Sequence, residues 1–378
     1  MKINQLDLFS GIGGFHLGFE KAGYKVTSFF SEVDKHAIAV YKQQFKNSTY
    51  VGSVTDVRGE DLPRIDLITF GSPCQDFSLA GKRKGMDGDR SSLILEAIRL
   101  VGECRPRVFV WENVKGTFSS NSGEDFAAII QAFANIGGYR LEWQLLNTSW
   151  FPRTPQNRER IYLVGYSTET KRDWRGVFPI GESNPKVDEL QRQHLPANTI
   201  LQRYNAGANV TYIGECKQSA QAVKQIGVRL DSGGKQPYQQ DRVYDADGIV
   251  PALNQGKSDL IVKVKSATSD GYEQAEVGDS INLSNPNSKT RRGRVGKQKA
   301  QTLETSCNQA VVENYRIRRL TPIECERLQG FPDDHTSLGN YDGEVKSMSN
   351  AQRYKQCGNA VTVDVVKAVA ERCKPLFK

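Results

Sequence analysis

Two short stretches of the sequence carry a candidate nucleophile and a candidate acid. Cys74 follows Pro73, directly after an apolar run that ends at Phe70. A cysteine fixed by proline at the carboxyl end of a strand is suited to nucleophilic attack, since nearby positive groups favour the reactive thiolate. Glu112 follows the next apolar run, Val108–Trp111. A partly buried carboxyl there can hold a proton near neutral pH. The pattern predicts a reactive cysteine one strand away from a protonated carboxyl.

Basic residues occur at two places that suit the same site. The stretch 81–90 is rich in glycine and in basic side chains, as expected of a loop that closes over phosphate. Arg158 and Arg160 stand two residues apart, and on a strand this spacing places both side chains on one face. Plain surface charge remains the alternative for the pair.

A glycine-rich stretch near the N-terminus indicates a second ligand. Residues 7–14, Asp-Leu-Phe-Ser-Gly-Ile-Gly-Gly, lead from an apolar run into a helical pattern, where glycines let the backbone approach a ligand. A plain tight turn is the alternative. A dinucleotide fingerprint needs a third glycine at position 16, which is His16. Glu32 ends the next apolar run and can accept hydrogen bonds from ribose hydroxyls. Asp56 is a candidate to hold the adenine amino group. Together they predict an adenosine-containing cofactor that need not be a dinucleotide.

The elements that must position these residues alternate over the first 170 residues. Short apolar runs alternate with amphipathic stretches, which is typical of a parallel sheet covered by helices. Such sheets bind ligands at the carboxyl ends of their strands. The expected strands are Ile3–Phe9, Lys25–Ser31, Ile65–Phe70, Val108–Trp111, Arg140–Leu146 and Arg160–Val164. The expected helices are Phe15–Ala22, Asp34–Phe45, Ser92–Glu103 and Ser122–Asn135.

The second half of the chain differs in character. Residues 180–315 are rich in Gly, Gln, Asn, Ser and Asp, and contain a basic run, Lys289–Lys299, that suits either a solvated face or contact with phosphates. A capping box at Thr321–Glu324 opens a helix that ends at Gly330, and Val361–Cys373 reads as a final amphipathic helix. We expect this last helix to rejoin the first domain. The expected domains are a catalytic one, residues 1–178 and 343–378, and an inserted one, residues 179–342, with helix 321–330 between them.

Composition excludes several classes of protein. The 378 residues include 51 Lys and Arg against 43 Asp and Glu, a formal charge of +8 that suits either a mildly basic surface or a polyanionic partner. Seven scattered cysteines without a Cys-x-x-Cys pair argue against a disulfide scaffold or a zinc site, so a reduced cytoplasmic protein without a metal is expected. Since no apolar run approaches the roughly 18 residues of a membrane span, and Asp7 interrupts the N-terminus, neither a span nor a signal peptide is expected.

The order and spacing of these blocks resemble the DNA (cytosine-5) methyltransferases of the bacterial and phage modification type. The resemblance covers residues 3–167 and 316–370. Its most specific part is Pro-Cys-Gln, then Glu-Asn-Val, then Gln-x-Arg-x-Arg in that order. The matching blocks are 7–14, 31–34, 71–78, 112–114, 156–160, 318–332 and 356–361.

The resemblance implies a mechanism and a role for each matched residue. Cys74 would attack carbon 6 of a cytosine flipped out of the duplex, and Glu112 would bind ring nitrogen 3 and the exocyclic amine. Arg160 would bind the carbonyl oxygen of the base, and Arg158 would support the loop around Cys74. The methyl donor would be S-adenosyl-L-methionine, leaving S-adenosyl-L-homocysteine. The implied donor-binding residues are Phe9, Gly11, Ile12, Gly14, Glu32, Val33, Asp56, Val57, Pro73, Asn359 and Val361. The implied DNA contacts are Gln75, Ser78, Lys82, Arg90 and Thr302, to which the basic run adds Arg291, Arg292 and Arg294.

The resemblance also implies a fold and partners. The fold would be α/β: a Rossmann-like class I methyltransferase sheet flanked by helices, with a smaller, mostly irregular or β target-recognition domain inserted before the C-terminal helix. The partner would be double-stranded DNA, the chain a monomer, and a separately encoded restriction endonuclease is left open. The recognised DNA sequence is not predicted.

Three other functions were weighed. An RNA cytosine-5 methyltransferase acting on tRNA is the main alternative, but that branch of the family carries a Cys-Phe-Thr stretch in its recognition region that this chain lacks. A binding module that lost its chemistry is disfavoured because Cys74, Glu112, Arg158 and Arg160 are all present. A nicotinamide oxidoreductase is disfavoured by His16.

Overall fold

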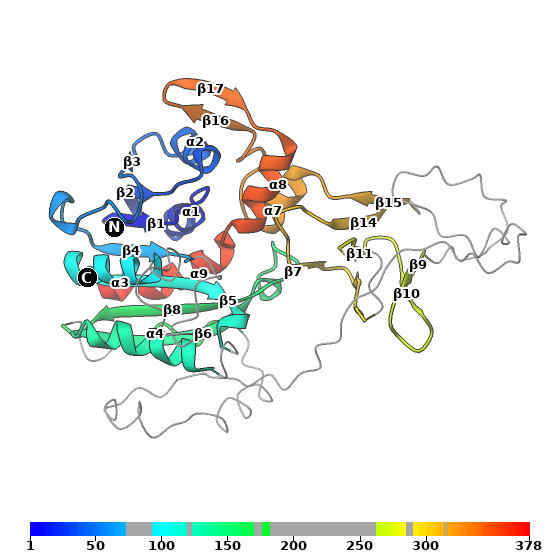
Figure 1. The fold of residues 1–378 in the computed structure, drawn as a ribbon, viewed down its shortest axis with the longest axis horizontal. Coiled ribbons are helices and arrows are strands. Elements are labelled where there is room, and N and C mark those ends of the chain that lie inside the picture. The colour runs from blue at the N-terminus through cyan, green and yellow to red at the C-terminus, as the bar shows by residue number, and fades with distance from the viewer. Residues whose placement is uncertain (73–92, 119–122, 170–175, 182–261, 285–289, 314–315) are drawn as a thin grey trace, which may run out of the picture.

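The fold is that of a computed structural model that describes residues 1–72, 93–118, 123–169, 176–181, 262–284, 290–313 and 316–378 (Figure 1). A seven-stranded sheet forms its centre, in the order β3-β2-β1-β4-β5-β8-β6. Its strands are β1 (Lys2–Leu8), β2 (Lys25–Ser31), β3 (Thr49–Tyr50), β4 (Leu67–Phe70), β5 (Val108–Val114), β6 (Tyr139–Asn147) and β8 (Glu159–Ser167). Each strand expected from an apolar run is present, and β3 is additional.

The sheet is parallel from β3 to β5, but β8 runs antiparallel to both β5 and β6. The apolar runs indicate a parallel sheet but do not reveal this reversed strand. The reason for the reversal is the short connection 148–158, which holds only η5 (Thr148–Trp150) and β7 (Gln156–Asn157). A parallel crossover needs a dozen or more residues, usually with a helix. The chain therefore turns back from β6 into its neighbour.

Helices cover both faces of the sheet. In β5, Val108 and Val110 point into one core with α1 (Gly14–Lys21) and α9 (Val363–Cys373). The residues between and after them, Phe109 and Trp111, point into the other core with α3 (Leu93–Cys104) and α4 (Glu124–Asn135). This period of two is what a strand buried on both faces requires. The C-terminal helix α9 lies against α1, as the sequence predicts, and α2 (Lys35–Gln44) precedes the edge strand β3.

A smaller β region follows. Strands β12, β11, β14 and β15 form an antiparallel sheet in that order, and β9 and β10 form a separate hairpin. Buried Ile281, Ala310 and Val312 form its core. The strands are β9 (Val262–Lys265), β10 (Tyr272–Ala275), β11 (Ser280–Asn282), β12 (Val295–Gly296), β13 (Ala300–Gln301), β14 (Gln309–Glu313) and β15 (Arg316–Arg319). The part of the expected recognition domain that the structure describes is thus mainly β.

The helix α7 (Pro322–Leu328) begins as predicted. The Thr321 side chain accepts from the Glu324 backbone N–H, and the Glu324 carboxylate accepts from the Thr321 N–H, which completes the capping box. The helix α8 (Asn350–Asn359) and the hairpin of β16 (Leu338–Tyr341) and β17 (Glu344–Ser347) were not predicted. α8 buries only Gln356 and Cys357, so its sequence lacks an apolar period.

Asn359, which the resemblance assigns to the methyl donor, does not cap the last helix. It is the final residue of α8, and Thr362 is the N-cap of α9. The short link 360–362 between the two helices places the end of α8 close to the start of α9.

Residues 330–342 contact the first domain rather than the β region. Lys21 donates to the Gly330 carbonyl at 2.7 Å, and Gln44 donates to the His335 carbonyl at 2.7 Å. A ring nitrogen of His335 lies 2.9 Å from the Ile12 carbonyl. We therefore propose that the catalytic domain resumes near residue 320, earlier than the expected boundary at 343.

A glycine in the central sheet tests this packing. Gly165 lies opposite Phe109 in the β5–β8 ladder, and a Cβ at Gly165 would come within 2.1 Å of the Phe109 ring. Gly165→Ala should lower the free energy of unfolding by about 1–3 kcal/mol through overpacking. In the matched control, Gly102→Ala on α3, a Cβ would meet nothing within 4 Å, so stability should rise by about 0.5–1 kcal/mol. Urea unfolding measures the free energy of unfolding of both variants. An unchanged free energy in Gly165→Ala would contradict the packing of Gly165 against Phe109.

Candidate active site

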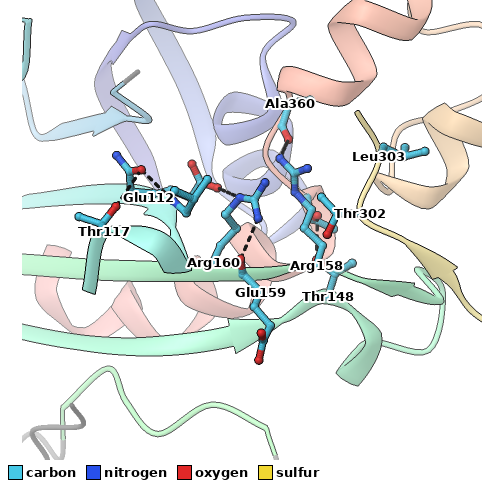
Figure 2. Close-up of polar contacts among 12 residues, drawn as sticks. Glu112, Thr117, Thr148, Arg158, Glu159, Arg160, Thr302, Leu303 and Ala360 are labelled. Atoms are coloured by element: carbon cyan, nitrogen blue, oxygen red, sulfur yellow. Dashed lines mark hydrogen bonds and ion pairs between the residues drawn. The ribbon is translucent and has the colours of Figure 1, made fainter. Parts of the chain in front are cut away.

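Glu112 lies inside β5, where the sequence had predicted that the strand ends one residue earlier. It pairs with Tyr162 of β8, and only 8% of the residue is exposed. The Arg160 guanidinium Nε lies 3.1 Å from a Glu112 carboxyl oxygen (Figure 2). Arg160 also donates to the Glu159 carbonyl at 2.8 Å. The antiparallel pairing of β5 and β8 thus brings an acid and a guanidinium together from two strands.

Opposing effects set the pKa of Glu112. Burial raises it above the usual range of a glutamate, while the charges of Arg160 and Arg158 lower it, and burial is the larger effect. The carboxyl therefore keeps a proton at higher pH than an exposed glutamate, although Arg160 fixes its position. A carboxyl in this state donates one hydrogen bond and accepts others.

Arg158 occupies a different position from the one predicted. It lies between β7 and β8 rather than within a strand, and it is 3% exposed. Its guanidinium donates to the Ala360 carbonyl at 2.9 Å and to the Gly358 carbonyl at 3.4 Å (Figure 2). Because its charge also acts on Glu112, Arg158 does face the site. Its described bonds hold the end of α8.

The exit of β4 is fixed beside Glu112. Trp111 donates from its indole nitrogen to the Ser72 hydroxyl at 3.1 Å, and Asn113 donates to the Ser72 carbonyl at 3.1 Å. A Cβ on Gly71 would lie 3.1 Å from a Glu112 carboxyl oxygen. Side chains on both sides of Glu112 therefore anchor the residue that stands two positions before Cys74.

Six predicted site residues lie outside the described part of the chain. They are Pro73, Cys74, Gln75, Ser78, Lys82 and Arg90. The described residues bring together the acid, both arginines and the segment that leads to the cysteine.

Thr302, which the resemblance predicts beside the flipped nucleotide, contacts the segment that precedes Arg158. Its hydroxyl donates to the Asn157 carbonyl at 2.8 Å, and the Leu303 backbone N–H donates to the Gln156 side-chain oxygen at 3.0 Å. The short strand β13 pairs in parallel with β7. The β region therefore docks directly onto the segment that carries Arg158.

Gln156 and Asn113 are functional residues to which the sequence analysis gave no role. Gln156 binds both the Leu303 N–H and, at 3.0 Å, the Leu328 carbonyl of α7, so it joins three segments. Asn113 holds Ser72. Both belong to the matched blocks, which is the signal that could have found them.

The glycine-rich loop and Glu32 form a cradle. Phe9 and Gly11 have φ values of 51° and 53°, which turn the chain sharply after β1. One Glu32 oxygen accepts the Gly11 N–H at 2.9 Å, and the other accepts the Val33 N–H at 2.8 Å. Glu32 thereby holds the loop against the end of β2 and keeps lone pairs for a ligand.

The cradle has room for an adenosine-containing group. A Cβ on Gly11 would meet nothing within 4 Å, and apolar Val33 is 77% exposed next to Glu32. On the other side, a Cβ on Gly14 would come within 2.6 Å of the Val361 side chain, so residue 361 closes the cradle. An open backbone, an exposed apolar side chain and a carboxylate fit a base and a ribose. Of the other predicted cofactor residues, Ile12 and Val57 are buried, while Asp56 and Asn359 are exposed.

The basic run does not form one exposed loop. Arg294 was predicted to contact DNA, but it is 1% exposed and donates to the Ser284 carbonyl, so it does not present its charge to a phosphate in this conformation. The residues around it have formed short strands, and burial of a long side chain with an internal acceptor explains its position. Arg291 also donates to the Ser284 carbonyl, at 3.3 Å, and is half-buried, whereas Arg292 is exposed.

Neither a cluster of metal ligands nor a membrane-spanning helix is present among the described residues. They contain no group of three or more His, Cys, Asp or Glu side chains that could hold a metal ion. No helix in the same ranges is long and apolar enough to cross a membrane.

Comparisons with known proteins agree with this geometry. A family model described as C-5 cytosine-specific DNA methylase matches residues 3–375. The chain is 30% identical over 366 residues to the type II methyltransferase M.Bsp6I of Bacillus sp. (strain RFL6), with 96% of each covered. It is 28% identical over 435 residues to the orphan methyltransferase M.SPRI of Bacillus phage SPR, covering 97% of this chain and 96% of the relative. A solved structure titled as a putative DNA modification methyltransferase encoded within an E. coli prophage has the same fold, with a TM-score of 0.53, 20% identity and 99% of both chains covered.

The electrostatic effect of Arg160 on Glu112 can be tested directly. Arg160→Met should raise the pKa of Glu112 further, because it removes the charge that lowers this pKa most. The carboxyl signal of Glu112 in a carbon-13 NMR titration, identified by its loss in Glu112→Gln, reports the change. Arg140→Met on β6 removes an exposed charge and should leave the titration unchanged. An unaltered pKa in Arg160→Met would contradict the arrangement.

Proposed function

The chain belongs to the C-5 cytosine-specific DNA methylase family and is a DNA (cytosine-5) methyltransferase. From this premise we propose that it methylates carbon 5 of a flipped-out cytosine within a specific duplex sequence, through a covalent adduct with Cys74. The observation that carries the proposal is the buried Glu112, whose pKa is raised by burial and which lies beside Arg160 and next to the anchored exit of β4.

Covalent attack is needed because carbon 5 of cytosine is a poor nucleophile. Addition of the Cys74 thiolate to carbon 6 pushes the electron pair of the 5,6 double bond toward carbon 5 and gives an enamine. The Ser72 anchor supports this step, since Trp111 and Asn113 restrain the backbone two residues before the thiol. Once carbon 5 has gained the methyl group, loss of its proton and departure of Cys74 as the thiolate would restore the 5,6 double bond and free the enzyme.

Glu112 would both select cytosine and stabilise the enamine. A protonated carboxyl donates to ring nitrogen 3 and accepts from the exocyclic amine. Thymine presents a donor at nitrogen 3 and an oxygen at carbon 4, so both hydrogen bonds would be mismatched. The raised pKa of Glu112 is the property that this role demands.

Arg160 would act on the other side of the base, where its guanidinium can bind the carbonyl oxygen while it holds Glu112. Arg158 would act indirectly, without touching the base. Its bonds to the Gly358 and Ala360 carbonyls fix the link between α8 and α9, which carries Val361 to the cofactor cradle.

The cradle would hold S-adenosyl-L-methionine, which supplies an electrophilic methyl group when bound. Glu32 would bind the ribose hydroxyls, and Val33 would cover the adenine. Asp56, exposed on the loop after β3, would bind the adenine amino group. Asn359 and Val361 would close the cradle near the methyl-bearing end.

The partner would be double-stranded DNA, with Thr302 beside the flipped nucleotide, Arg292 on a phosphate, and the stretch from Gln75 to Arg90 closing over the base. We propose a monomer that acts in the cytoplasm on chromosomal or phage DNA. The relatives include a type II methyltransferase and an orphan enzyme, so a restriction endonuclease partner stays open. The tRNA methyltransferase is the alternative, and the absence of a Cys-Phe-Thr stretch speaks against it.

Removal of the nucleophile tests the mechanism. Cys74→Ser should lower methyl transfer from tritiated S-adenosylmethionine to DNA by at least about 10³-fold, because a hydroxyl is a far weaker nucleophile than a thiolate. Binding of S-adenosylhomocysteine should be unchanged. Cys104→Ser, on α3 and half-buried, is the matched control and should keep full activity. Undiminished transfer by Cys74→Ser would overturn the covalent mechanism.

Exchange of a segment tests target choice. When residues 180–315 are replaced by the corresponding segment of a relative with a known target, the methylated sequence should become that of the donor of the segment, since base edges are read by this region. Bisulfite sequencing of modified plasmid gives the target, and S-adenosylhomocysteine binding confirms that the chimera is folded. A folded chimera that keeps the original target would show that specificity lies elsewhere.

A further inference from the structure

His16, which stands in the place of a third glycine, belongs to a buried chain of polar side chains behind the glycine loop. It is 4% exposed, and its ring stacks on Phe45 with centroids 3.9 Å apart. Its Nδ1 lies 3.1 Å from the Tyr41 hydroxyl on α2. That hydroxyl lies 2.7 Å from the Ser28 hydroxyl and 3.3 Å from an Asp7 carboxyl oxygen. These hydrogen bonds thus join α1 and α2 to the end of β1. The methyl-transfer mechanism uses none of these side chains.

Asp7 is fully buried, with 0% of the residue exposed. The described side chains that contact it are neutral: Thr69 donates at 2.7 Å to one carboxyl oxygen, and Tyr41 lies at the other. Burial raises the pKa of Asp7 to about 8, the two hydrogen bonds lower it, and the charge of Glu32 adds to the increase. Asp7 therefore carries a proton at neutral pH and is poised to lose it at mildly alkaline pH.

The proton of the Asp7 carboxyl sets the direction of the hydrogen bonds around Tyr41. The Tyr41 hydroxyl has one hydrogen and three neighbours, Asp7, Ser28 and His16. When Asp7 is protonated, it donates to the Tyr41 oxygen, which leaves Tyr41 free to donate to Ser28 or to His16. When Asp7 is ionised, Tyr41 must donate to Asp7 and can only accept from the other two. Loss of one proton therefore reverses the hydrogen bonds between β1, β2, α1 and α2.

The same set of hydrogen-bonded side chains ends at the cradle. Asp7 precedes Phe9 by two residues, and the backbone of Gly11 in this loop is held by the Glu32 carboxylate at 2.9 Å. An ionised Asp7 would add a second negative charge that acts on Glu32. The titratable groups that face Asp7 are Tyr41 from α2, Glu32 from the end of β2, and, through Tyr41, His16 of α1, whose Nε2 lies 3.4 Å from Glu20. From β4 the contact is the neutral Thr69.

We propose that Asp7 is a positioning residue for the methyl donor: it shares a proton with Tyr41, and loss of that proton weakens binding at the Phe9–Gly14 loop. The inference rests on the proposed function only in that this loop binds the adenosine-containing donor. Glu32 and the loop backbone touch the ligand, and Asp7 acts through them.

Binding of S-adenosylhomocysteine, which has no sulfonium charge, tests the proposal without DNA or turnover. Dissociation constants are measured by calorimetry between pH 6.5 and 9.5 for the unchanged chain and for Asp7→Asn. Their ratio cancels titration of the ligand's own amino group. Relative to Asp7→Asn, the unchanged chain should lose at least about threefold in affinity as the pH passes 8. By linkage, a threefold loss means that ligand binding raises the pKa of Asp7 by about half a unit.

Two further variants keep the proposal falsifiable. Asp61→Asn, at an exposed aspartate, should retain the pH dependence of the unchanged chain. Tyr41→Phe removes a hydrogen bond that lowers the pKa of Asp7, so the loss of affinity should move to higher pH. This variant also tests the proposal if Asp7→Asn does not fold. A pH dependence that is the same in the unchanged chain, Asp7→Asn and Tyr41→Phe would overturn the proposal. Failure of the unchanged chain to bind at any pH would instead contradict the proposed function.

Discussion

The structure of the site depends on burying the Glu112 carboxyl next to Arg160. Burial disfavours the charged carboxylate, and the neighbouring guanidinium favours it, so the acid remains protonatable while its position is fixed. The reversed strand β8 makes this possible, because it places Arg160 opposite the end of β5. A wholly parallel sheet would have put a crossover there instead. In the central sheet, the antiparallel strand β8 is therefore what brings Arg160 to Glu112.

The segment around Arg158 also unites the two regions of the molecule. Gln156 holds Leu303 on one side and Leu328 of α7 on the other, and Arg158 holds the link after α8. In Figure 1, β7 lies between the central sheet and the β region that contains β11 and β14. The β region, α7 and the link after α8 are thus joined to the central sheet through a short, hydrogen-bonded segment.

Much of this arrangement follows from the sequence. Short apolar runs predict the central strands, and the capping box predicts the start of α7. The order and spacing of the blocks around Cys74, Glu112 and Arg160 indicate the family that the comparisons show. Other features depend on tertiary contacts that local patterns do not encode. The helix α8 is polar and is held by its neighbours, Arg294 is buried by the fold of the basic run, and the two hydrogen-bond partners of Asp7 come from β4 and α2. Propensity and periodicity report local preference, whereas these positions are decided by packing.

The central claim is that the chain methylates carbon 5 of cytosine in a defined duplex DNA sequence. Bisulfite sequencing of DNA from cells that have no other cytosine methylation and that express the chain tests this most directly. The account predicts unconverted cytosines at one short recurring sequence, and full conversion of the same sites when Cys74→Ser is expressed. Complete conversion of the DNA, with protected cytosines found in tRNA instead, would contradict it.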